Sequence, residues 1–411
     1  MLNHEFDIAI VGAGPAGATL ALSLAPTGRR IAIVDKQLFP REMICGDALS
    51  GQVNNVLKRM PDGIYQDFLD QVVKTPSWGV RFFSPGNDPL ELPFLVPTTK
   101  DQEPPGYICP RVDFDNFLFQ RLKNYSNIER FEGRTVKEIK TESDHVLITT
   151  DTQTIQAELV VGADGLNSSV RQSVSERQLD KGYYCMAIRA YFEGVTDFHP
   201  ENFIELVFLK ELLPAYFWIF PEVNGRANAG LGIPYADMIK KRLSLKQTME
   251  QLIQEHPLIA PRFRNATMVT KPKARGLALH RNLKQLSGDR YLLLGDAALL
   301  VDPFTGEGVG NAMASAESAT AVIKDCFNSG EFSSTRLHAY DKRIERRMGM
   351  EHSTSASLLR FAHFPKLFDL VVRKANKNKP FKELLASAFT NDDVRKKLAN
   401  PLFYARLVIG I

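Results

Sequence analysis

The first 36 residues show two kinds of hydrophobic pattern. The run FDIAIVG (6–12), which is apolar apart from Asp7, predicts a buried parallel strand, and RRIAIVDK (29–36) predicts a second one. Between them, AGATLALSLAPTG (16–28) predicts a helix that ends at Gly28. A strand, a helix and a strand in this order make a βαβ unit, so we expect a parallel sheet at the start of the chain.

Later segments return to this style. RYLLLGD (290–296) predicts another buried strand, and the small-residue-rich run from Gly306 to Phe327 predicts a long helix. VDFDNFLFQRL (112–122) predicts an amphipathic helix, and residues 129–162 alternate like a β-meander. These segments extend the βαβ unit into a Rossmann-like domain.

The remaining segments follow other patterns. Residues 77–96 are irregular and strand-rich, and residues 183–234 contain apolar runs separated by turn residues. After residue 331 the pattern predicts helices separated by prolines. We therefore predict an α/β protein. It would have a Rossmann-like domain with a parallel sheet and a β-meander, an antiparallel-sheet domain and C-terminal helices.

The composition is that of an ordinary globular protein. Of 411 residues, 44% are hydrophobic and 24% are charged, and no apolar run approaches the roughly 18 residues needed to cross a bilayer. No basic segment precedes the first strand, so we expect no secretory signal. Cys45, Cys109, Cys185 and Cys326 form no C-x-x-C pair, and the histidines show no ligand spacing. We expect a cytoplasmic protein without a bound metal.

Charge is unevenly distributed along the chain. The net charge is +4, but residues 331–411 contain 16 Lys and Arg against 8 Asp and Glu and so carry +8. No nucleic-acid-binding module accompanies this basic region, so we expect no nucleic acid as a partner. LLRFAHFPKLFDLVVRK (358–374) and NPLFYARLVIGI (400–411) place apolar residues beside the charges. This pattern fits either peripheral membrane contact or a helix packed on the core.

A glycine-rich turn is the first candidate for chemistry. It follows the first strand, opens the first helix, and consists of Gly12, Gly14, Pro15, Ala16 and Gly17. Such glycines permit a tight turn and a close approach of the backbone to a pyrophosphate. Asp35, followed by Lys36, ends the second strand about 20 residues on, where a carboxylate accepts from ribose hydroxyls. The motif predicts a dinucleotide site but does not separate NAD from FAD.

Two further segments favour FAD. GADGLNSSVR (162–171) follows a strand, and its Asp164 and Gly165 form a turn suited to a phosphate or a ribose. In LLLGDAALLVDPFTGEGVGNAM, an aspartate can bond a ribityl chain, and a helix start can stabilise the negative charge of reduced flavin. The candidate residues of this third segment are Gly295, Asp296, Pro303, Gly306, Glu307, Gly308 and Val309. NAD has neither a ribityl chain nor such an anion.

In combination, the three segments resemble the glutathione-reductase-type FAD fold of the aromatic-hydroxylase superfamily. Within it, PAYFWIFP (214–221) resembles the P-x-Y-x-W-x-F-P motif of the geranylgeranyl reductase family. PREMICGDALSG (40–51) resembles the Cys-Gly segment of that family. YICPRVDFDNFL (107–118), with Arg111 and Asp115, resembles its R-x-x-F-D helix start.

The resemblance implies three parts. They are a FAD-binding domain (1–75, 107–180 and 285–330), a substrate-binding sheet domain (76–106 and 181–284) and a C-terminal helical region (331–411). It places Cys45, Gly46 and Arg111 at the cofactor. It also implies that Tyr216, Trp218 and Phe220 line a long substrate cavity beside the flavin. From the residues alone, three rings at alternate strand positions are equally typical of a sheet core.

The implied reaction is hydride transfer from the flavin to an isolated carbon–carbon double bond of an isoprenoid lipid, with a proton delivered to the other carbon. Cys45 is the candidate functional thiol, and a redox pair with Cys109 is a further hypothesis. A buried structural cysteine is the alternative. The chain has no second dinucleotide motif, so we expect NAD(P)H to dock transiently or ferredoxin to supply the electrons.

Two other functions are compatible with the sequence. An aromatic monooxygenase or halogenase shares all three FAD segments, although the W-x-W-x-I-P strand of halogenases is only partly matched because its first ring here is Tyr216. A non-catalytic, membrane-associated lipid-binding flavoprotein would use the basic C-terminal region. The identity of the isoprenoid is left open by the sequence.

Overall fold

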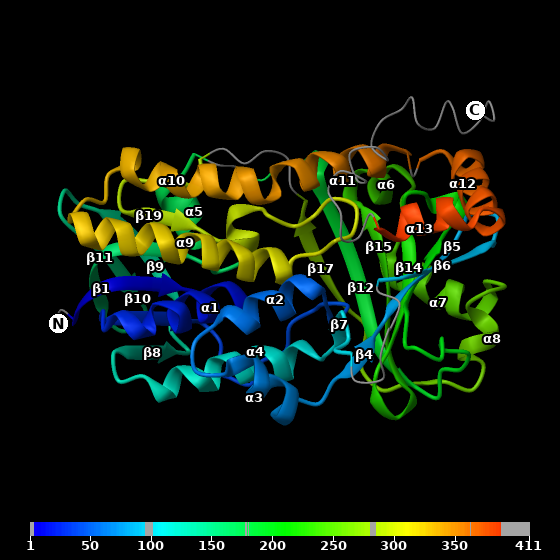
Figure 1. Cartoon of the computed structure of the whole chain (residues 1–411), viewed down its shortest axis with the longest axis horizontal. Coiled ribbons are helices and arrows are strands. Elements are labelled where there is room, and N and C mark those ends of the chain that lie inside the picture. The colour runs from blue at the N-terminus through cyan, green and yellow to red at the C-terminus, as the bar shows by residue number, and fades with distance from the viewer. Residues whose placement is uncertain are drawn as a thin grey trace.

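The computed structural model describes residues 4–94, 102–176, 179, 181–279, 285–361 and 363–387. Two large sheets lie at opposite ends of an elongated molecule (Figure 1). In this view α10 (Ser334–Ile344) and α11 (Met350–Phe361) follow one another along the top of the molecule, and α9 (Val309–Ser329) lies beneath α10. The predicted α/β fold class is confirmed.

The first sheet is built on parallel strands. Its order is β18 (Ser287–Gly288), β19 (Tyr291–Leu293), β11 (Thr154–Gly162), β1 (His4–Val11), β2 (Ile31–Asp35) and β8 (Ile128–Glu132). The strands from β19 to β8 are parallel, and β9 (Val136–Thr141) and β10 (Val146–Thr150) add an antiparallel meander on β11. The runs that predicted β1 and β2 are continuous because both faces of these strands are buried.

Five further helices belong to this unit. They are α1 (Pro15–Leu24), α2 (Gly51–Arg59), α3 (Ile64–Gln71), α4 (Arg111–Arg121) and α5 (Ser169–Val174). α1 packs against α4 and α9. α4 differs from the predicted amphipathic helix, because it is buried on most of its circumference. Its Phe114 packs edge-on against Phe68 of α3, with ring centres 5.7 Å apart.

The second sheet is antiparallel except for one pair. Its order is β16 (Thr267–Met268), β12 (Tyr184–Glu193), β15 (Arg226–Pro234), β14 (Tyr216–Pro221), β13 (Ile204–Phe208), β5 (Gly79–Phe83) and β6 (Pro89–Pro93). β17 (Lys273–Ala278) also pairs with β12, and β13 and β5 are parallel. A small sheet of β3 (Ala48–Leu49), β7 (Gly106–Ile108) and β4 (Thr75–Ser77) lies between the two large ones (Figure 1).

One face of the second sheet packs in that sheet's own core, and the opposite face contacts the Rossmann-like unit. Phe217, Ile219 and Leu231 face helices α7 (Leu245–Glu255) and α8 (Ala260–Phe263) and form a buried core there. α6 (Tyr235–Lys240) follows β15. The rings at alternate positions of β14 point to the opposite face, because successive side chains of a strand alternate.

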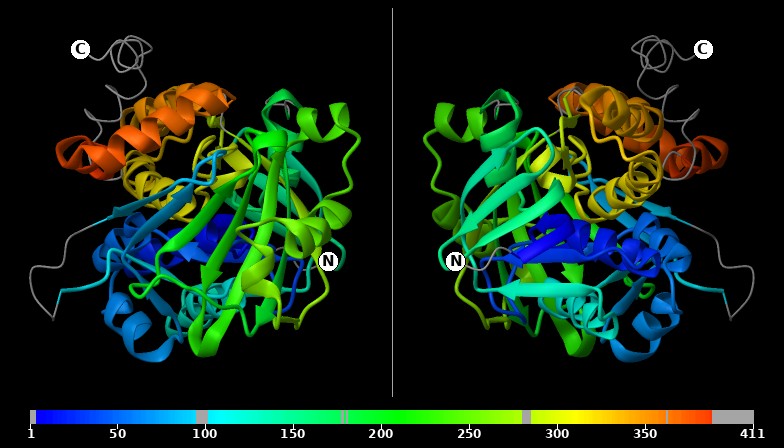
Figure 2. Two further views of the ribbon diagram at one scale, coloured as in Figure 1. Left: turned by 90° about the vertical axis from the view of Figure 1, so that its right-hand side faces the viewer. Right: turned by 90° about the vertical axis from the view of Figure 1, so that its left-hand side faces the viewer.

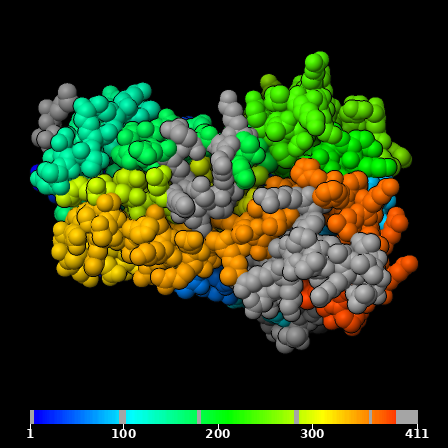
Figure 3. Space-filling view, turned by 90° about the horizontal axis from the view of Figure 1, so that it is seen from above, coloured from blue at the N-terminus to red at the C-terminus, as the bar shows by residue number. Residues whose placement is uncertain are grey.

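The C-terminal helices α12 (Pro365–Lys377) and α13 (Lys379–Ser387) cover the β6 edge of the second sheet (Figure 2). Val372 is buried against β5 and β6, and the Phe368 ring lies 4.7 Å from that of Phe208. The apolar face of α12 therefore packs on the core, whereas Phe364 is 59% exposed. Seen from above, the orange helices form a band along the molecule (Figure 3).

Two further points concern membrane contact. NPLFYARLVIGI (400–411) lies outside the described residues. Within the described part of the chain, no helix is long and apolar enough to cross a bilayer.

Candidate active site

The glycine-rich turn is closed on two sides by backbone. Gly12 has a φ of 101°, and a Cβ there would stand 2.3 Å from the carbonyl oxygen of Ala163. A Cβ on Gly17 would stand 1.9 Å from the carbonyl oxygen of Gly12. A side chain at either position would therefore separate β1 from α1 or from the end of β11. A Cβ on Gly14 would lie 3.2 Å from Nη2 of Arg41, so a cation stands beside the start of α1.

Asp35 lies next to this turn, at the end of β2. Its Oδ2 accepts a hydrogen bond of 2.8 Å from the Ala13 N–H, and its Oδ1 accepts one of 2.8 Å from the Gln37 N–H. A carboxylate has about four lone-pair sites, so two remain for hydroxyl donors. The half-buried carboxylate at the carboxyl end of the sheet therefore suits a ribose. Lys36 is exposed beside it.

The third segment lies directly against the first and second. Gly295 has a φ of 53°, and a Cβ there would lie 3.5 Å from Cβ of Ala16. Asp296 forms an ion pair of 3.4 Å with Nη2 of Arg275. The same Nη2 lies 3.6 Å from the position of a Cβ on Gly165. The three segments that predicted one cofactor site therefore meet in space.

Asp164 and Arg171 hold the second segment in place. Oδ2 of Asp164 accepts from the Ser169 N–H at 2.6 Å and so caps α5, and burial raises the pKa of Asp164. Arg171 is fully buried and donates to the carbonyl oxygens of Leu166 at 2.5 Å and Ala297 at 2.9 Å. Arg171 thus joins the second segment to the third. The sequence of the second segment did not show whether this arginine would bind backbone or a phosphate.

A tight loop precedes α9. Oδ1 of Asp302 accepts from the N–H and the hydroxyl of Thr305, at 2.8 and 2.9 Å. The Glu307 side chain hydrogen-bonds with the Ser50 hydroxyl at the start of α2. From Val309 onward, the first N–H groups of α9 have no partner within the helix, as at any helix start. This loop therefore presents donors and the positive end of the helix dipole toward the site.

Arg41 is a functional candidate that sequence reasoning missed. It is only 8% exposed, and its guanidinium lies 3.2 Å from Oδ2 of Asp115. Arg111 binds the same carboxylate through two hydrogen bonds of 2.6 and 2.8 Å. Two buried guanidinium groups thus share one carboxylate, which leaves positive charge beside Gly14 for an anion. Arg41 lies in the segment that resembles the Cys-Gly segment, but nothing in that pattern singles it out, so its tertiary contacts identify it.

The turn formed by residues 45–47, which we call the Cys45 turn, is anchored to the second sheet. Asp47 is fully buried and accepts from the Tyr191 hydroxyl at 2.6 Å, from Nδ2 of Asn228 at 2.7 Å and from the Arg111 N–H at 3.2 Å. Burial raises the pKa of Asp47, and the donors oppose this effect. The turn is therefore held by both units of the molecule.

The two candidate thiols lie in different surroundings. Cys45 is partly exposed, and burial raises the pKa of its thiol while the nearby Arg111 guanidinium opposes the rise. Cys109 is fully buried, with its sulfur 3.8 Å from the Val73 carbonyl oxygen. Both thiols are free. Since the ordinary pKa of a cysteine lies above 8, the Cys45 thiol carries its proton at neutral pH.

The three rings of β14 form one cluster at the junction of the two units. The ring centres of Tyr216 and Trp218 are 6.4 Å apart, and those of Trp218 and Phe220 are 6.3 Å apart. The Phe220 ring lies 2.8 Å from the position of a Cβ on Gly46. The Tyr216 hydroxyl lies 3.4 Å from the position of one on Gly306. The cluster therefore contacts both the Cys45 turn and the loop before α9.

The face of the second sheet that carries these rings changes in character across its strands. Trp218 of β14 pairs with Gly230 of β15, Gly230 with Arg189 of β12, and Arg189 with Lys273 of β17. The face thus passes from aromatic through glycine to cationic. It can contact an apolar chain at one end and an anion at the other.

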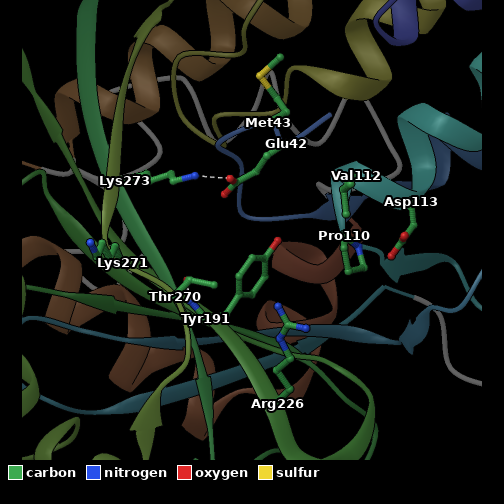
Figure 4. A pocket seen from close by; sticks show the side chains of 10 residues that line it. All are labelled: Glu42, Met43, Pro110, Val112, Asp113, Tyr191, Arg226, Thr270, Lys271 and Lys273. Atoms are coloured by element: carbon green, nitrogen blue, oxygen red, sulfur yellow. Dashed lines mark hydrogen bonds and ion pairs between the residues drawn. The ribbon is translucent and has the colours of Figure 1, made fainter. Parts of the chain in front are cut away.

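A cavity of about 550 Å³ lies at the cationic end (Figure 4). The Tyr191 ring stands between two guanidinium groups, 4.3 Å from that of Arg189 and 4.1 Å from that of Arg226. Lys273 forms an ion pair with Glu42 across the cavity wall, as Figure 4 shows. The polar lining comprises Glu42, Asp113, Tyr191, Arg226, Thr270, Lys271 and Lys273.

The fold and the site define a Rossmann-type flavoprotein, because three glycine-bearing segments converge beside a buried cation. The FAD binding domain family matches residues 5–351, and the chain belongs to this family. It is a FAD-dependent oxidoreductase, and it is similar to proteins named as geranylgeranyl-type reductases.

Two relatives illustrate the similarity. Digeranylgeranylglycerophospholipid reductase of Thermoplasma volcanium is 25% identical over 85% of this chain and 85% of its own length. Menaquinone reductase of Mycolicibacterium smegmatis is 26% identical over 75% of this chain and 74% of its own length.

Solved structures share the fold at lower identity. A geranylgeranyl bacteriochlorophyll reductase-like protein of Thermoplasma acidophilum superposes with a TM-score of 0.80 at 22% identity, covering 97% of this chain and 99% of its own. A flavin-dependent brominase superposes with a TM-score of 0.77 at 19% identity, covering 99% and 98%. The fold by itself therefore does not separate a reductase from a halogenase.

Proposed function

We propose that the protein hydrogenates carbon–carbon double bonds of an isoprenoid lipid. The observation that carries the proposal is the position of the Tyr216, Trp218 and Phe220 cluster, which contacts both the Cys45 turn and the loop before α9. Relatives that bear the name digeranylgeranylglycerophospholipid reductase support it.

The converging segments would hold FAD. Gly12 and Gly17 leave no room for a Cβ, and Arg41 adds a buried cation at the start of α1, as a diphosphate requires. When bound, the flavin supplies the hydride. The other proposed contacts are Gly14, Pro15, Ala16, Asp35, Lys36, Cys45, Gly46, Arg111, Asp164, Gly165, Gly295, Asp296, Pro303, Gly306, Glu307, Gly308 and Val309.

The aromatic cluster would bind the isoprenoid chain. Such a chain offers little besides apolar surface, and every 100 Å² that the rings cover contributes roughly 2.5 kcal/mol. Rigid rings also lose little rotamer entropy on binding. Trp218 is 6% exposed and Phe220 is 9% exposed, so a bound chain would lie along Tyr216 and the edges of the other two rings.

Cys45 would supply the proton. Its thiol is protonated at neutral pH, and the guanidinium of Arg111 can stabilise the thiolate left after proton transfer. An isolated double bond has no carbonyl to activate it, so alignment and exclusion of water would contribute much of the rate. The packing of Gly46 against Phe220 helps to keep water away from this turn.

A reduced nicotinamide dinucleotide or ferredoxin would deliver the electrons. The cavity favours the dinucleotide, because Arg226, Lys271 and Lys273 line a volume of about 550 Å³ that suits a small anionic molecule. K271E and wild type can be compared in anaerobic flavin reduction by NADPH and by reduced ferredoxin. A slower reaction with NADPH alone would support docking in this cavity.

The C-terminal region would contact the membrane surface from which a lipid substrate comes. Phe364 is 59% exposed at the start of α12, close in sequence to Lys366. Flotation of the full chain with anionic and neutral vesicles tests this contact. Equal recovery of F364S and wild type from anionic vesicles would argue against a role for Phe364.

The decisive experiment for the reaction starts with the yellow, FAD-bound protein. After reduction under argon, it is offered a panel of prenyl lipids, and mass spectrometry scores a gain of about two mass units per reduced double bond. We expect the flavin to reoxidise as this product forms. Reoxidation only by oxygen, with hydroxylation or halogenation of an aromatic compound, would instead identify a monooxygenase or halogenase. FAD binding without turnover of any substrate would leave a lipid-binding flavoprotein.

A further inference from the structure

Three neighbouring strands of the second sheet place side chains in one row behind the Cys45 turn. Tyr191 of β12 pairs with Asn228 of β15, and Asn228 pairs with Phe220 of β14. Asn228 is fully buried at the centre of this row. A buried amide is tolerated in a sheet only where its polar atoms have partners, so its contacts define its role.

The amide of Asn228 uses its oxygen and its nitrogen at the same time. Its Oδ1 accepts from Nε1–H of Trp218 at 3.0 Å. Its Nδ2 donates to the Cys45 carbonyl oxygen at 2.8 Å and to Oδ2 of Asp47 at 2.7 Å. A single side chain thus links the central ring of the aromatic cluster to both ends of the Cys45 turn. A carboxamide has an acceptor oxygen and two N–H donors. This uncharged side chain can therefore accept from an indole and also donate to both a carbonyl and a carboxylate.

The Cys45 turn has little freedom to adjust by itself. A Cβ on Gly46 would stand 2.8 Å from the Phe220 ring. Asp47 has a φ of 69°, a left-handed conformation that is uncommon outside glycine and persists where surrounding contacts hold it. These contacts include the hydrogen bond from Tyr191. A change at Asn228 would therefore be transmitted to the backbone of Cys45.

We propose that Asn228 is a positioning residue that fixes the Cys45 turn relative to the Trp218 ring. It would act through these two groups without touching the substrate. An isoprenoid chain laid on the rings would then stand at a constant distance from the thiol. The catalytic meaning of this distance rests on the proposed function, whereas the mechanical link between Trp218 and Cys45 does not.

N228D tests the link with little change in shape. The new carboxylate can still accept from Trp218, but it loses both donors and stands beside the Asp47 carboxylate. Leaving a buried group unpaired costs about 1–3 kcal/mol, so opening of the turn should become about 5- to 150-fold more frequent. We expect the alkylation of Cys45 by iodoacetamide, in FAD-loaded protein, to accelerate by such a factor. Cys185, which is also partly exposed, is the internal reference.

Two further variants separate positioning from general destabilisation. N54D changes another buried asparagine, whose Nδ2 donates to the Pro104 carbonyl oxygen, and should leave Cys45 alkylation unchanged. D47N/N228D restores one amide and one carboxylate, so its alkylation rate should return toward that of wild type. We also expect N228D to lower kcat and the double variant to recover part of that loss.

The outcomes are distinct. Cys45 alkylation in FAD-loaded N228D within twofold of wild type would overturn the inference, as would equal acceleration in N54D. The inference would also be overturned if Cys45 were alkylated as fast in D47N/N228D as in N228D. Faster alkylation in a protein that reduces no prenyl lipid would instead contradict the proposed function and leave the link standing.

Discussion

Tyr191 donates a hydrogen bond of 2.6 Å to Asp47, and this bond joins the second sheet to the turn that carries Cys45. The Tyr191 ring is 6% exposed and lies between the guanidinium groups of Arg189 and Arg226. Its hydroxyl is therefore held in one place. The junction of the two units is thus centred on a buried polar pair, with the aromatic cluster on one side and cations on the other.

Y191F removes only this hydroxyl. Because hydrogen bonds to charged groups contribute about 1.5–3 kcal/mol, we expect the free energy of unfolding to fall by about 1–3 kcal/mol in urea denaturation. Y65F is the matched control, since the Tyr65 hydroxyl bonds with exposed Glu103 at 3.1 Å. That change should cost less than about 0.5 kcal/mol. Equal stability of Y191F and wild type would mean that Asp47 does not depend on Tyr191.

G17A should yield protein that does not retain FAD. A Cβ at this position would stand 1.9 Å from the Gly12 carbonyl oxygen, so α1 would have to move away from the turn that receives the diphosphate. G28A is the control: Gly28 also lies close to α1 and has a φ of 72°, but a Cβ there would meet nothing within 4 Å. The flavin absorbance per mole of protein measures the result. A yellow G17A protein would contradict the proposed cofactor site.

Phe220 and Phe217 provide a paired test of the two faces of β14. Phe217 is fully buried in the sheet's own core, so F217A should cost about 3–5 kcal/mol of unfolding free energy. F220A should cost less and should raise the KM for the prenyl substrate several-fold, because its ring belongs to the cluster facing the Cys45 turn. Steady-state kinetics and urea denaturation give both values. An unchanged KM in F220A would remove this ring from the substrate site.

Glu222 should make the stability of the protein depend on pH. Burial, together with the charge of Asp47, raises the pKa of Glu222 to about 7 from an ordinary value of 4.5. The native state therefore holds this proton more tightly than the unfolded state. The contribution of Glu222 to the free energy of unfolding should therefore fall as pH rises from 4.5 to 7, and it should level off above pH 7.

E222Q cannot undergo this ionisation. Relative to wild type, its free energy of unfolding should rise by on the order of 1–3 kcal/mol between pH 4 and pH 8. Denaturation of both proteins across this range measures the difference. Parallel pH profiles would show that Glu222 ionises in the native state as easily as in the unfolded chain.

The sequence predicts the elements that depend on local patterns. The strand, helix and strand over residues 6–36 are present as β1, α1 and β2, and Gly28 ends the helical segment in a left-handed conformation, as a terminal glycine does. The glycine turn was recognisable because the glycines that leave space for a close backbone approach, Gly12, Gly14 and Gly17, lie close together in the sequence. The prediction that α4 is amphipathic was wrong, because two of its own charged residues, Arg111 and Asp115, are buried and pair with each other.

Pairings between distant residues could not be read in this way. Arg41 and Asp115 have no distinctive spacing, and neither do Asn228 and Asp47; the individual residue types are common on protein surfaces. Their roles follow from being buried together, which is a property of the folded chain. Arg171 illustrates the converse. It belongs to the segment that predicted contact with a phosphate or a ribose, but its guanidinium binds two backbone carbonyls.

The sequence by itself determined that Tyr216, Trp218 and Phe220 share one face of a strand, because side chains alternate along an extended backbone. It did not determine what that face contacts. The intervening residues Phe217 and Ile219 are equally apolar, so either face could have formed the core beneath α7 and α8. Only the tertiary structure decided this, by docking the Cys45 turn and the loop before α9 against the rings.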